Sequence, residues 1–313
     1  MTDFLERALA LADETLGLAH PKPDVGAVVV RDGDVVGEGT TELRGRHGEI
    51  VALDAAGERA RGATLYVTME PCAHQGSTPP CADAIVAAGV ARVVAGSRDP
   101  NPVAAGGLER LRNAGIEIEL VDSFRARQQN EAWRTWVSHG RPFVTWKVAV
   151  TVDGRVTFPG RRWITGELSR RSVHELRARV DAVAVGMGTV RIDNPRLDAR
   201  DVNAQRQPRR LAFGRGPLHE DSELELRSGA LSDELRQLAD EGVQSLMLEG
   251  GPTLATAFLR EDLVDKLLVY VAPVIAGSGR RLLDDLPEPV RLIRLTADPI
   301  GEDVLLTAYV HEP

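Results

Sequence analysis

The sequence is poor in aromatic residues, short of positive charge and almost free of cysteine. Only 4% of its 313 residues are aromatic, and 46 acidic residues against 38 lysines and arginines give a net charge of −8. A nucleic-acid-binding protein needs a basic surface and aromatic side chains on which bases stack, so this composition argues against that class. No uninterrupted apolar run approaches the roughly 18 residues that a membrane helix requires.

The first residues, Met1 to Glu6, contain neither the positive segment nor the apolar segment of a secretory signal peptide. We therefore expect a cytoplasmic protein, in which disulfides are uncommon and the two cysteines stay reduced. Hydrophobic residues make up 43% of the chain and charged residues 27%, which is ordinary for a globular protein. The length is sufficient for two domains, each with its own core.

Both cysteines lie in one segment that also contains a histidine and a glutamate at short spacing. The segment reads His47-Gly48-Glu49 and, further on, Pro71-Cys72 and Pro80-Cys81. One His and two Cys hold zinc in deaminases, where a water takes the fourth position. Glu49 would not bind the metal, and its carboxylate would transfer the proton to the departing amine.

The local pattern places these groups at the ends of regular elements. Residues 48–56 have helical spacing, residues 63–69 read as a buried strand that ends before Cys72, and a second helix opens at Cys81 after two prolines. Two helix N-termini and a strand end would bring the imidazole and both thiolates to one point. A structural zinc site, with His74 as the fourth ligand, is the alternative.

Alternating helix and strand patterns predict two α/β domains, 1–140 and 141–313. The first opens with a helix whose apolar residues lie between Phe4 and Leu16, followed by a hairpin of strands at 25–31 and 35–39. The pattern predicts a three-layer domain with the zinc site at strand ends. The polar segment 123–139 is predicted to be one connecting helix.

Several residues of the second half are candidates for chemistry, although each also has a structural explanation. Lys147 interrupts the apolar strand predicted at 143–150. Glycine-rich turns after the strands predicted at 181–186 and 245–248 can bring backbone N–H groups onto a phosphate. Snorkelling of Lys147, a tight turn at Gly188 and helix capping by Glu249 are the structural alternatives.

Taken together, these motifs resemble the bifunctional deaminase/reductases of riboflavin biosynthesis over nearly the whole chain. The first half matches through His47-x-Glu49, Met69-Glu70-Pro71-Cys72 and Thr78–Ile85. Eight residues separate the cysteines, against typically about two in cytidine deaminases. The second half matches through Lys147, Asp153-Gly154, Trp163-Ile164-Thr165, Leu176-Arg177-Ala178, Gly188-Thr189-Val190, Asp193-Asn194-Pro195 and Glu249-Gly250-Gly251.

The resemblance implies a cytidine-deaminase-like domain followed by a dihydrofolate-reductase-like α/β domain. The implied reactions are zinc-dependent deamination of a diamino-ribosylamino-pyrimidinone phosphate and NADPH-dependent reduction of its ribosyl group to ribityl. The implied metal ligands are His47, Cys72 and Cys81, and the implied catalytic residues are Glu49 and Lys147. By matching position, NADPH would face Ala149, Trp163, Thr189, Asp193, Gly251, Pro252, Thr253, Leu254, Ala255, Thr256 and Ala257. The substrate would face Arg161, Arg177, Leu197, Arg200 and Glu249.

Two positions depart from the family pattern: Lys22 replaces a common Asn, and Ser77 replaces a common Arg or Lys. Either Lys22 or Arg46 takes over a phosphate contact, or the deaminase binds its substrate more weakly. The alternative enzyme is a zinc deaminase of another nucleobase or nucleotide with a non-catalytic, nucleotide-binding second domain, and the non-enzymatic alternative is a zinc-stabilised binding module. We expect a small-molecule substrate, no nucleic-acid or membrane partner, and a homo-oligomer.

Overall fold

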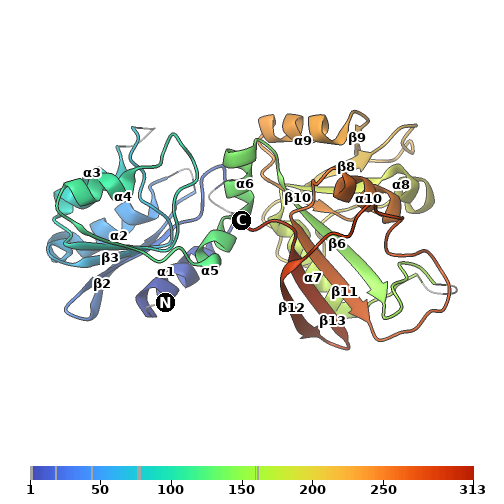
Figure 1. Cartoon of the computed structure of the whole chain (residues 1–313), viewed down its shortest axis with the longest axis horizontal. Helices are drawn as coiled ribbons and strands as arrows, with labels where there is room; N and C mark the ends of the chain where they lie inside the picture. Colours follow the sequence, from blue (N-terminus) through green and yellow to red (C-terminus); the bar gives the residue numbers. More distant parts are fainter. Residues whose placement is uncertain (1–2, 18–19, 44, 76–78, 159, 161) are drawn as a thin grey trace. The chain divides into compact units, whose positions relative to one another are not determined.

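The computed structural model describes residues 3–17, 20–43, 45–75, 79–158, 160 and 162–313. The chain divides into two compact units, Met1–His139 and Gly140–Glu312, each with its own β-sheet (Figure 1). Within the described residues, no helix combines the length and the apolar character needed to cross a membrane.

The first unit is a five-stranded sheet between two layers of helices, as the sequence predicts. Its elements are α1 (Asp3–Glu14), β1 (Gly26–Arg31), β2 (Asp34–Thr40), α2 (Gly48–Ala56), the 3₁₀-helix η1 (Gly57–Ala60), β3 (Thr64–Val67), α3 (Cys81–Ala88), β4 (Arg92–Ala95), α4 (Gly107–Asn113), β5 (Glu117–Leu120), α5 (Phe124–Gln129) and α6 (Glu131–His139). The strand order is β2-β1-β3-β4-β5, with β1 antiparallel to both neighbours and β3, β4 and β5 parallel. Helices α2, α3 and α4 pack on one face, and α1 and α5 on the other.

Short-range signals set the β1–β2 hairpin and the close packing of α2 against it. Asp32 and Gly33 both have positive φ, at 53° and 88°, which suits an Asp-Gly turn between antiparallel strands. Gly37 of β2 has no side chain because a Cβ there would lie 2.3 Å from the carbonyl oxygen of Ala52 in α2. The helix that begins just after His47 therefore rests directly on the sheet.

The prediction of one connecting helix over 123–139 is wrong, because Asn130 interrupts it between α5 and α6. The buried Asn130 amide accepts a hydrogen bond from the backbone N–H of Asp24 and donates one to the carbonyl of the same residue. The backbone of Asn130, at φ −115° and ψ 29°, is not helical, and its carbonyl accepts from the backbone N–H of Arg134 at 2.9 Å at the start of α6. The segment also belongs to the first unit, since Trp133 packs into its core.

The second unit is an eight-stranded sheet, again covered on both faces. Its elements are β6 (Phe143–Thr151), α7 (Glu167–Arg179), β7 (Ala182–Gly186), α8 (Met187–Asp193), β8 (Arg209–Phe213), β9 (Glu225–Arg227), α9 (Leu231–Asp240), β10 (Ser245–Leu248), α10 (Pro252–Arg260), β11 (Lys266–Ala272), β12 (Ile293–Ile300) and β13 (Asp303–Tyr309). The order is β12-β13-β11-β6-β10-β7-β8-β9, and all neighbours from β11 to β9 are parallel. Helices α7 and α8 pack on one face, and α9 and α10 on the other.

The parallel centre of this sheet explains where its polar residues meet. Strand β6 lies between β10 and β11, and Leu248, the last residue of β10, pairs with Trp146 of β6. The next residues along the two strands are Glu249 and Lys147. They therefore lie side by side where β10 ends, in the kind of position where parallel α/β sheets bind ligands.

Candidate active sites

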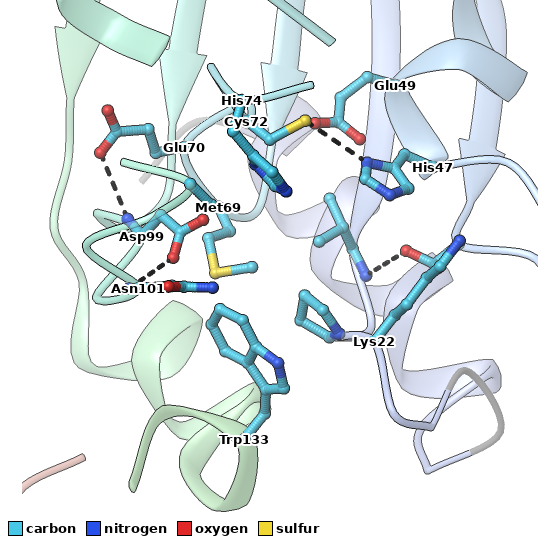
Figure 2. A pocket seen from close by; sticks show the side chains of 14 residues that line it. Lys22, His47, Glu49, Met69, Glu70, Cys72, His74, Asp99, Asn101 and Trp133 are labelled. Atoms are coloured by element: carbon cyan, nitrogen blue, oxygen red, sulfur yellow. Dashed lines mark hydrogen bonds between the residues drawn. The ribbon is translucent and has the colours of Figure 1, made fainter. Parts of the chain in front are cut away.

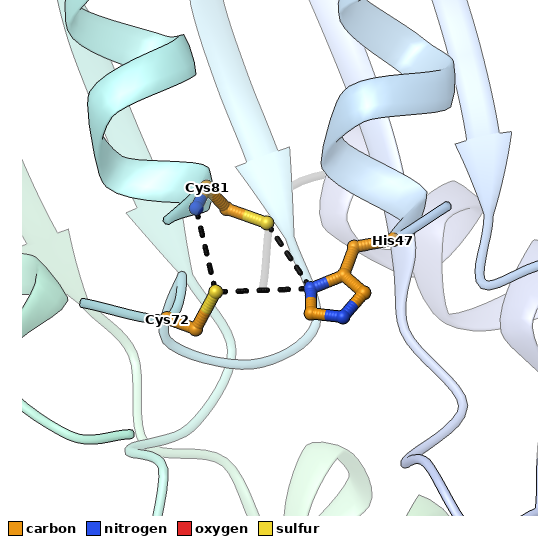
Figure 3. Close-up of side chains that lie close together, drawn as sticks. All are labelled: His47, Cys72 and Cys81. Carbon is orange, nitrogen blue, oxygen red and sulfur yellow. Dashed lines mark hydrogen bonds between the residues drawn. The ribbon is translucent and has the colours of Figure 1, made fainter. Parts of the chain in front are cut away.

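Three side chains from separate elements converge in the first unit (Figure 3). His47 immediately precedes α2, Cys72 lies beyond the end of β3, and Cys81 is the first residue of α3. Their ligand atoms all lie within 4.8 Å of one another. This confirms the predicted convergence of the imidazole and the two thiols, whereas His74 does not belong to the cluster formed by the described residues.

The spacing of the cluster fits a zinc ion. His47 Nδ1 lies 3.2 Å from Cys81 Sγ and 3.7 Å from Cys72 Sγ. Standard Zn–N and Zn–S bonds at a tetrahedral angle place the two ligand atoms about 3.6 Å apart, between the two observed values. Three protein ligands leave one tetrahedral position for a reacting molecule, which is the arrangement of a catalytic site rather than a structural one.

The close approach of Cys72 and Cys81 shifts the pKa values of their thiols in opposite directions. A hydrogen bond from Cys81 lowers the pKa of the Cys72 thiol to about 4, and the same contact, together with burial, raises the pKa of the Cys81 thiol. The backbone N–H of Cys81 also donates to Cys72 Sγ at 3.3 Å. Zinc binding requires both groups as thiolates and releases the remaining proton.

Glu49 lies beside this cluster, within the first turn of α2. Glu49 is only 3% exposed, and its carboxylate oxygen Oε2 has no hydrogen-bond partner within the described part of the chain. Burial raises the pKa of its carboxyl group above the ordinary value, with the nearby His47 acting in the opposite direction. A buried carboxyl group with an unused oxygen is suited to exchanging a proton with a ligand.

A cavity of about 210 Å³ opens in front of the cluster (Figure 2). Its lining includes Glu49 and His74, together with three residues that the sequence did not single out, Trp133, Asp99 and Asn101. Burial raises the pKa of the Asp99 carboxyl group to about 6, against the lowering effect of its hydrogen bond from the backbone N–H of Asn101. The cavity therefore combines the metal cluster with an aromatic wall and polar groups.

The loop that carries these polar groups is held by Glu70. Its carboxylate accepts backbone hydrogen bonds from Asp99 at 3.3 Å and from Gly106 and Leu108 at 3.1 Å each. Gly107 lies so close to Pro71 that a Cβ would stand 1.6 Å from its carbonyl oxygen. The loop is thus fixed against the strand end that presents Cys72.

The two basic residues proposed for a phosphate contact have different surroundings. Lys22 lines the cavity on the side of His47 (Figure 2). Its ammonium donates to the carbonyl of Gly45 at 2.8 Å. Arg46 does not line the cavity and instead forms ion pairs with Glu42 and Asp54. Ser77 lies outside the described residues.

In the second unit, Glu249 joins Lys147 on β6 to Arg177 on α7. Arg177 donates to both carboxylate oxygens, Nε to Oε1 at 2.6 Å and Nη2 to Oε2 at 3.0 Å, and Lys147 Nζ lies 3.6 Å from Oε2. Burial acts to raise the pKa of Glu249, but the two cations outweigh it and hold the pKa at about 2. The three side chains are only 12–15% exposed, so the charges sit in a largely dry environment.

A cavity of about 860 Å³ lies over this triad, near the upper end of the size range for ligand sites. The predicted catalytic residue Lys147 lines it, as do many of the residues predicted to face NADPH or the substrate: Ala149, Trp163, Arg177, Thr189, Asp193, Arg200, Glu249, Gly251 and Pro252. The cavity also meets the N-terminus of α10, where backbone N–H groups can receive a phosphate. The residues therefore fit a nucleotide cofactor together with a second anionic ligand.

Six other predicted residues, all within the described part of the chain, do not line this cavity. They are Leu197, Thr253, Leu254, Ala255, Thr256 and Ala257. Leu197 and Ala255 are buried in the core, and the Thr256 hydroxyl accepts a hydrogen bond from the backbone N–H of Asp284. Arg161 lies outside the described residues. A contact between these residues and a ligand stays a prediction.

Sequence reasoning missed further residues of this cavity that lie on α7. Arg170, Arg171 and His174 line it together with Arg177. The spacings of four residues from Arg170 to His174 and three from His174 to Arg177 place these three side chains on one helix face. The exposed ring of Trp163 has the guanidinium groups of Arg162 and Arg170 within 5.0 and 5.4 Å of its centroid. The helical spacing of these basic residues was a signal that could have identified the face.

Both halves of the chain match known protein families. Residues 142–306 match the RibD C-terminal domain, and residues 1–97 match the cytidine and deoxycytidylate deaminase zinc-binding region. The chain is 39% identical to the riboflavin biosynthesis protein RibD of Aquifex aeolicus over 97% of each chain. It is 38% identical to RibD of Mycobacterium tuberculosis (strain ATCC 25618 / H37Rv), covering 97% of this chain and 96% of that protein.

Solved structures show the same likeness over both units. RibD of Acinetobacter baumannii, form 1, superposes with a TM-score of 0.87 at 33% identity and covers 98% of this chain and 97% of that one. The diaminohydroxyphosphoribosylaminopyrimidine deaminase/5-amino-6-(5-phosphoribosylamino)uracil reductase of Thermotoga maritima gives 0.85 at 34% identity, with the same coverage.

Proposed function

Because the chain belongs to the RibD family of bifunctional riboflavin-biosynthesis enzymes, we propose that its two sites act in turn on one pyrimidine ribosylamine phosphate. The protein is a zinc-dependent deaminase and an NADPH-dependent reductase. Residues 1–140 would remove the ring amino group, and residues 141–313 would then reduce the ribosyl group to ribityl. The observation that carries the proposal is the pairing of a His-Cys-Cys cluster beside a buried Glu49 with a second cavity over the Lys147–Glu249–Arg177 triad.

In the deaminase site, His47, Cys72 and Cys81 would hold the metal, and Glu49 would handle the proton. Zinc, when bound there, supplies Lewis-acid chemistry that makes a water nucleophilic near neutral pH. The unpartnered Oε2 of Glu49 would carry a proton to the amino group as the C–N bond breaks, so that ammonia leaves as a neutral molecule. Trp133 would pack against the pyrimidine ring and exclude water from the buried end of the cavity.

Lys22, rather than Arg46, is the residue that we assign to the substrate phosphate in this site. The ammonium of Lys22 uses one of its three donors on Gly45, while the guanidinium of Arg46 is taken up by two carboxylates outside the cavity. A charge-assisted contact from Lys22 would compensate for Ser77 at the position where the family commonly has a basic residue.

In the reductase site, NADPH supplies the hydride. The cofactor would be held by Thr189 on α8 and by Gly251 and Pro252 at the start of α10, all of which line the cavity. Arg200 would bind the anionic part of the substrate, because a guanidinium group offers two donors to a phosphate. The guanidinium of Arg177 is already bound to Glu249 and to the carbonyl of Asp198, so Arg177 would hold the Glu249 carboxylate in place. Lys147, with Glu249 beside it, would donate the proton that balances hydride addition to the ring-opened sugar.

A cytoplasmic location is proposed from the need for NADPH and for two reduced cysteines. Assembly into a homo-oligomer stays a prediction, which sedimentation of the purified chain would check. The alternative with a non-catalytic second domain conflicts with the full-length match to bifunctional relatives.

The test of the proposed function is an assay that follows two products separately in the full chain. The purified protein, given the diamino-pyrimidine ribosylamine phosphate, should release ammonia without NADPH and should oxidise NADPH only after ammonia appears. NADPH oxidation without ammonia release would contradict the proposed order. Ammonia release with no NADPH oxidation at any time would contradict the reductase assignment.

A further inference from the structure

The ammonium of Lys147 has only a loose contact with its acidic neighbour. Its distance of 3.6 Å from Glu249 Oε2 exceeds the 2.7–3.2 Å typical of an N–H···O hydrogen bond, whereas Arg177 holds both oxygens of the same carboxylate at 2.6 and 3.0 Å. Glu249 therefore neutralises Lys147 but does not fix the position of its ammonium. Another group has to do this if the lysine is to deliver a proton to one atom.

That second group is Tyr270, on the neighbouring strand β11. Parallel pairing sets Leu268 against Lys147 and Tyr270 against Ala149, so the Lys147 and Tyr270 side chains leave the same face of the sheet. The Lys147 ammonium lies over the Tyr270 ring, 5.8 Å from its centroid. An ammonium within about 6 Å of an aromatic face is attracted by the ring, more strongly when water is excluded.

The Tyr270 ring is itself rigidly held. Only 1% of the residue is exposed, and its hydroxyl shares a 2.9 Å hydrogen bond with Ser172 Oγ on α7. Ser172 precedes Arg177 by five residues, or about 7.5 Å along the helix. One tyrosine thus contacts Lys147 through its ring and, through its hydroxyl, the helix that presents Arg177.

We propose that Tyr270 is a positioning residue of the reductase: its ring face fixes the Lys147 ammonium, and its bond to Ser172 fixes the ring. The proposal rests on the proton-donor role assigned above to Lys147. It predicts that the electrostatic character of the ring, and not only its bulk, controls the chemical step of reduction. Substrate and NADPH binding do not depend on it, because Tyr270 does not line the cavity.

The chain contains a matched control for this contact. Lys266 lies over the ring of Tyr309 at 5.0 Å from the centroid, and Tyr309 is also 1% exposed. The pair joins β11 and β13 of the same sheet, and neither residue lines the cavity. Removing the Tyr309 ring therefore imposes a similar packing defect without touching Lys147.

The experiment measures kcat and KM for NADPH oxidation in the full chain, with the deaminated substrate supplied. Tyr270→Phe keeps the ring but loses its bond to Ser172, so kcat should fall, by about threefold at most. Tyr270→Leu should lower kcat by about 5- to 30-fold, the range that corresponds to a desolvated ammonium–ring contact. KM for NADPH and the rate of ammonia release should stay within about twofold. Tyr309→Leu should lower thermal stability without a comparable loss of kcat.

A shape-matched pair keeps the proposal testable if Tyr270→Leu does not fold. Tyr270→pentafluorophenylalanine has nearly the shape of Tyr270→Phe but lacks the negative ring face, so it should be slower than the phenylalanine variant by about 5-fold or more. Equal kcat for these two variants, or an equal loss of kcat in Tyr309→Leu, would overturn the proposal. Lys147→Ala tests the proton-donor role of Lys147 separately from the positioning role of Tyr270. A wild-type kcat in that variant would refute the role of the lysine, and with it the role of Tyr270.

Discussion

Replacing Glu49 by glutamine is the sharpest test of the deaminase site. The amide keeps the shape of the buried side chain but cannot exchange a proton in the way a carboxylate does. Loss of a positioned acid–base group costs about 10²–10⁴-fold in rate, which corresponds to about 3–5 kcal/mol of barrier. Ammonia release should fall by that factor, whereas the three metal ligands and the reductase unit are left in place.

The same substitution should leave the fold as stable or make it more stable. Burial raises the pKa of the Glu49 carboxyl group because its charged form is disfavoured there, and a neutral amide of the same shape does not carry that cost. Thermal unfolding of Glu49→Gln should therefore occur at the wild-type temperature or above. Activity and stability would then move independently, which a general folding defect cannot produce.

The assay compares Glu49→Gln with Glu58→Gln, a matched change at an exposed glutamate that follows α2. Ammonia release, zinc content and NADPH oxidation with pre-deaminated substrate are measured on each protein. The expected result is a loss of ammonia release in the first variant alone, with zinc and NADPH oxidation unchanged in both. Wild-type ammonia release from Glu49→Gln would refute the assigned proton transfer, and loss of zinc would mean that Glu49 supports the metal instead.

Four further predictions concern single residues. Lys147→Ala should slow NADPH oxidation by about 10²-fold or more and spare ammonia release, given the usual size of proton-transfer effects; equal loss of both activities would indicate misfolding. The pKa of Glu249 is held at about 2, against an ordinary 4.5, which contributes about 3 kcal/mol to the free energy of unfolding above pH 4.5. This contribution is lost as the pH falls towards 2. In denaturant titrations, Glu249→Gln should therefore make the free energy of unfolding depend less on pH between about pH 4.5 and pH 2. A hydrogen bond to Asp265 raises the pKa of His311, so its contribution to stability is complete below about pH 6.5 and disappears as the pH rises through the raised pKa. His311→Gln should abolish this loss of stability above about pH 6.5, and an unchanged slope would exclude this origin. Lys22→Asn should raise the deaminase KM for the phosphorylated substrate about tenfold, and an unchanged KM would reject the phosphate contact.

The parts of the molecule that the sequence predicted well depend on residues close together in the chain. The metal ligands lie at the ends of α2, β3 and α3, whose patterns are visible locally, and the Asp-Gly turn marks the hairpin. The sequence identified Lys147 because it interrupts a predicted strand, and Glu249 because it follows one. The pairing of Glu249 with both Lys147 and Arg177 was not readable, since it depends on strand order and on how α7 packs over the sheet.

The predictions that failed concern features that depend on contacts between residues far apart in the chain. A helical pattern over 123–139 gives no sign that Asn130 pairs with the backbone of Asp24, 106 residues away, and so breaks the helix. Because that break directs α6 back onto the first unit, Trp133 becomes a cavity wall rather than part of a connector. Similarly, the glycine-rich turn identified the start of α10, but only packing decided that Ala255 is buried in the core.

The sequence by itself determined which chemical groups are available: a histidine and two cysteines for a metal, a nearby acid, a lysine within one predicted strand and a glutamate at the end of another. Only the tertiary structure decided what surrounds them, including the cavity walls, the Arg177 partner of Glu249 and the tyrosine under Lys147. The physical reason is that periodicity along the chain defines which face of an element is buried. The element that covers this face is chosen by contacts between distant segments.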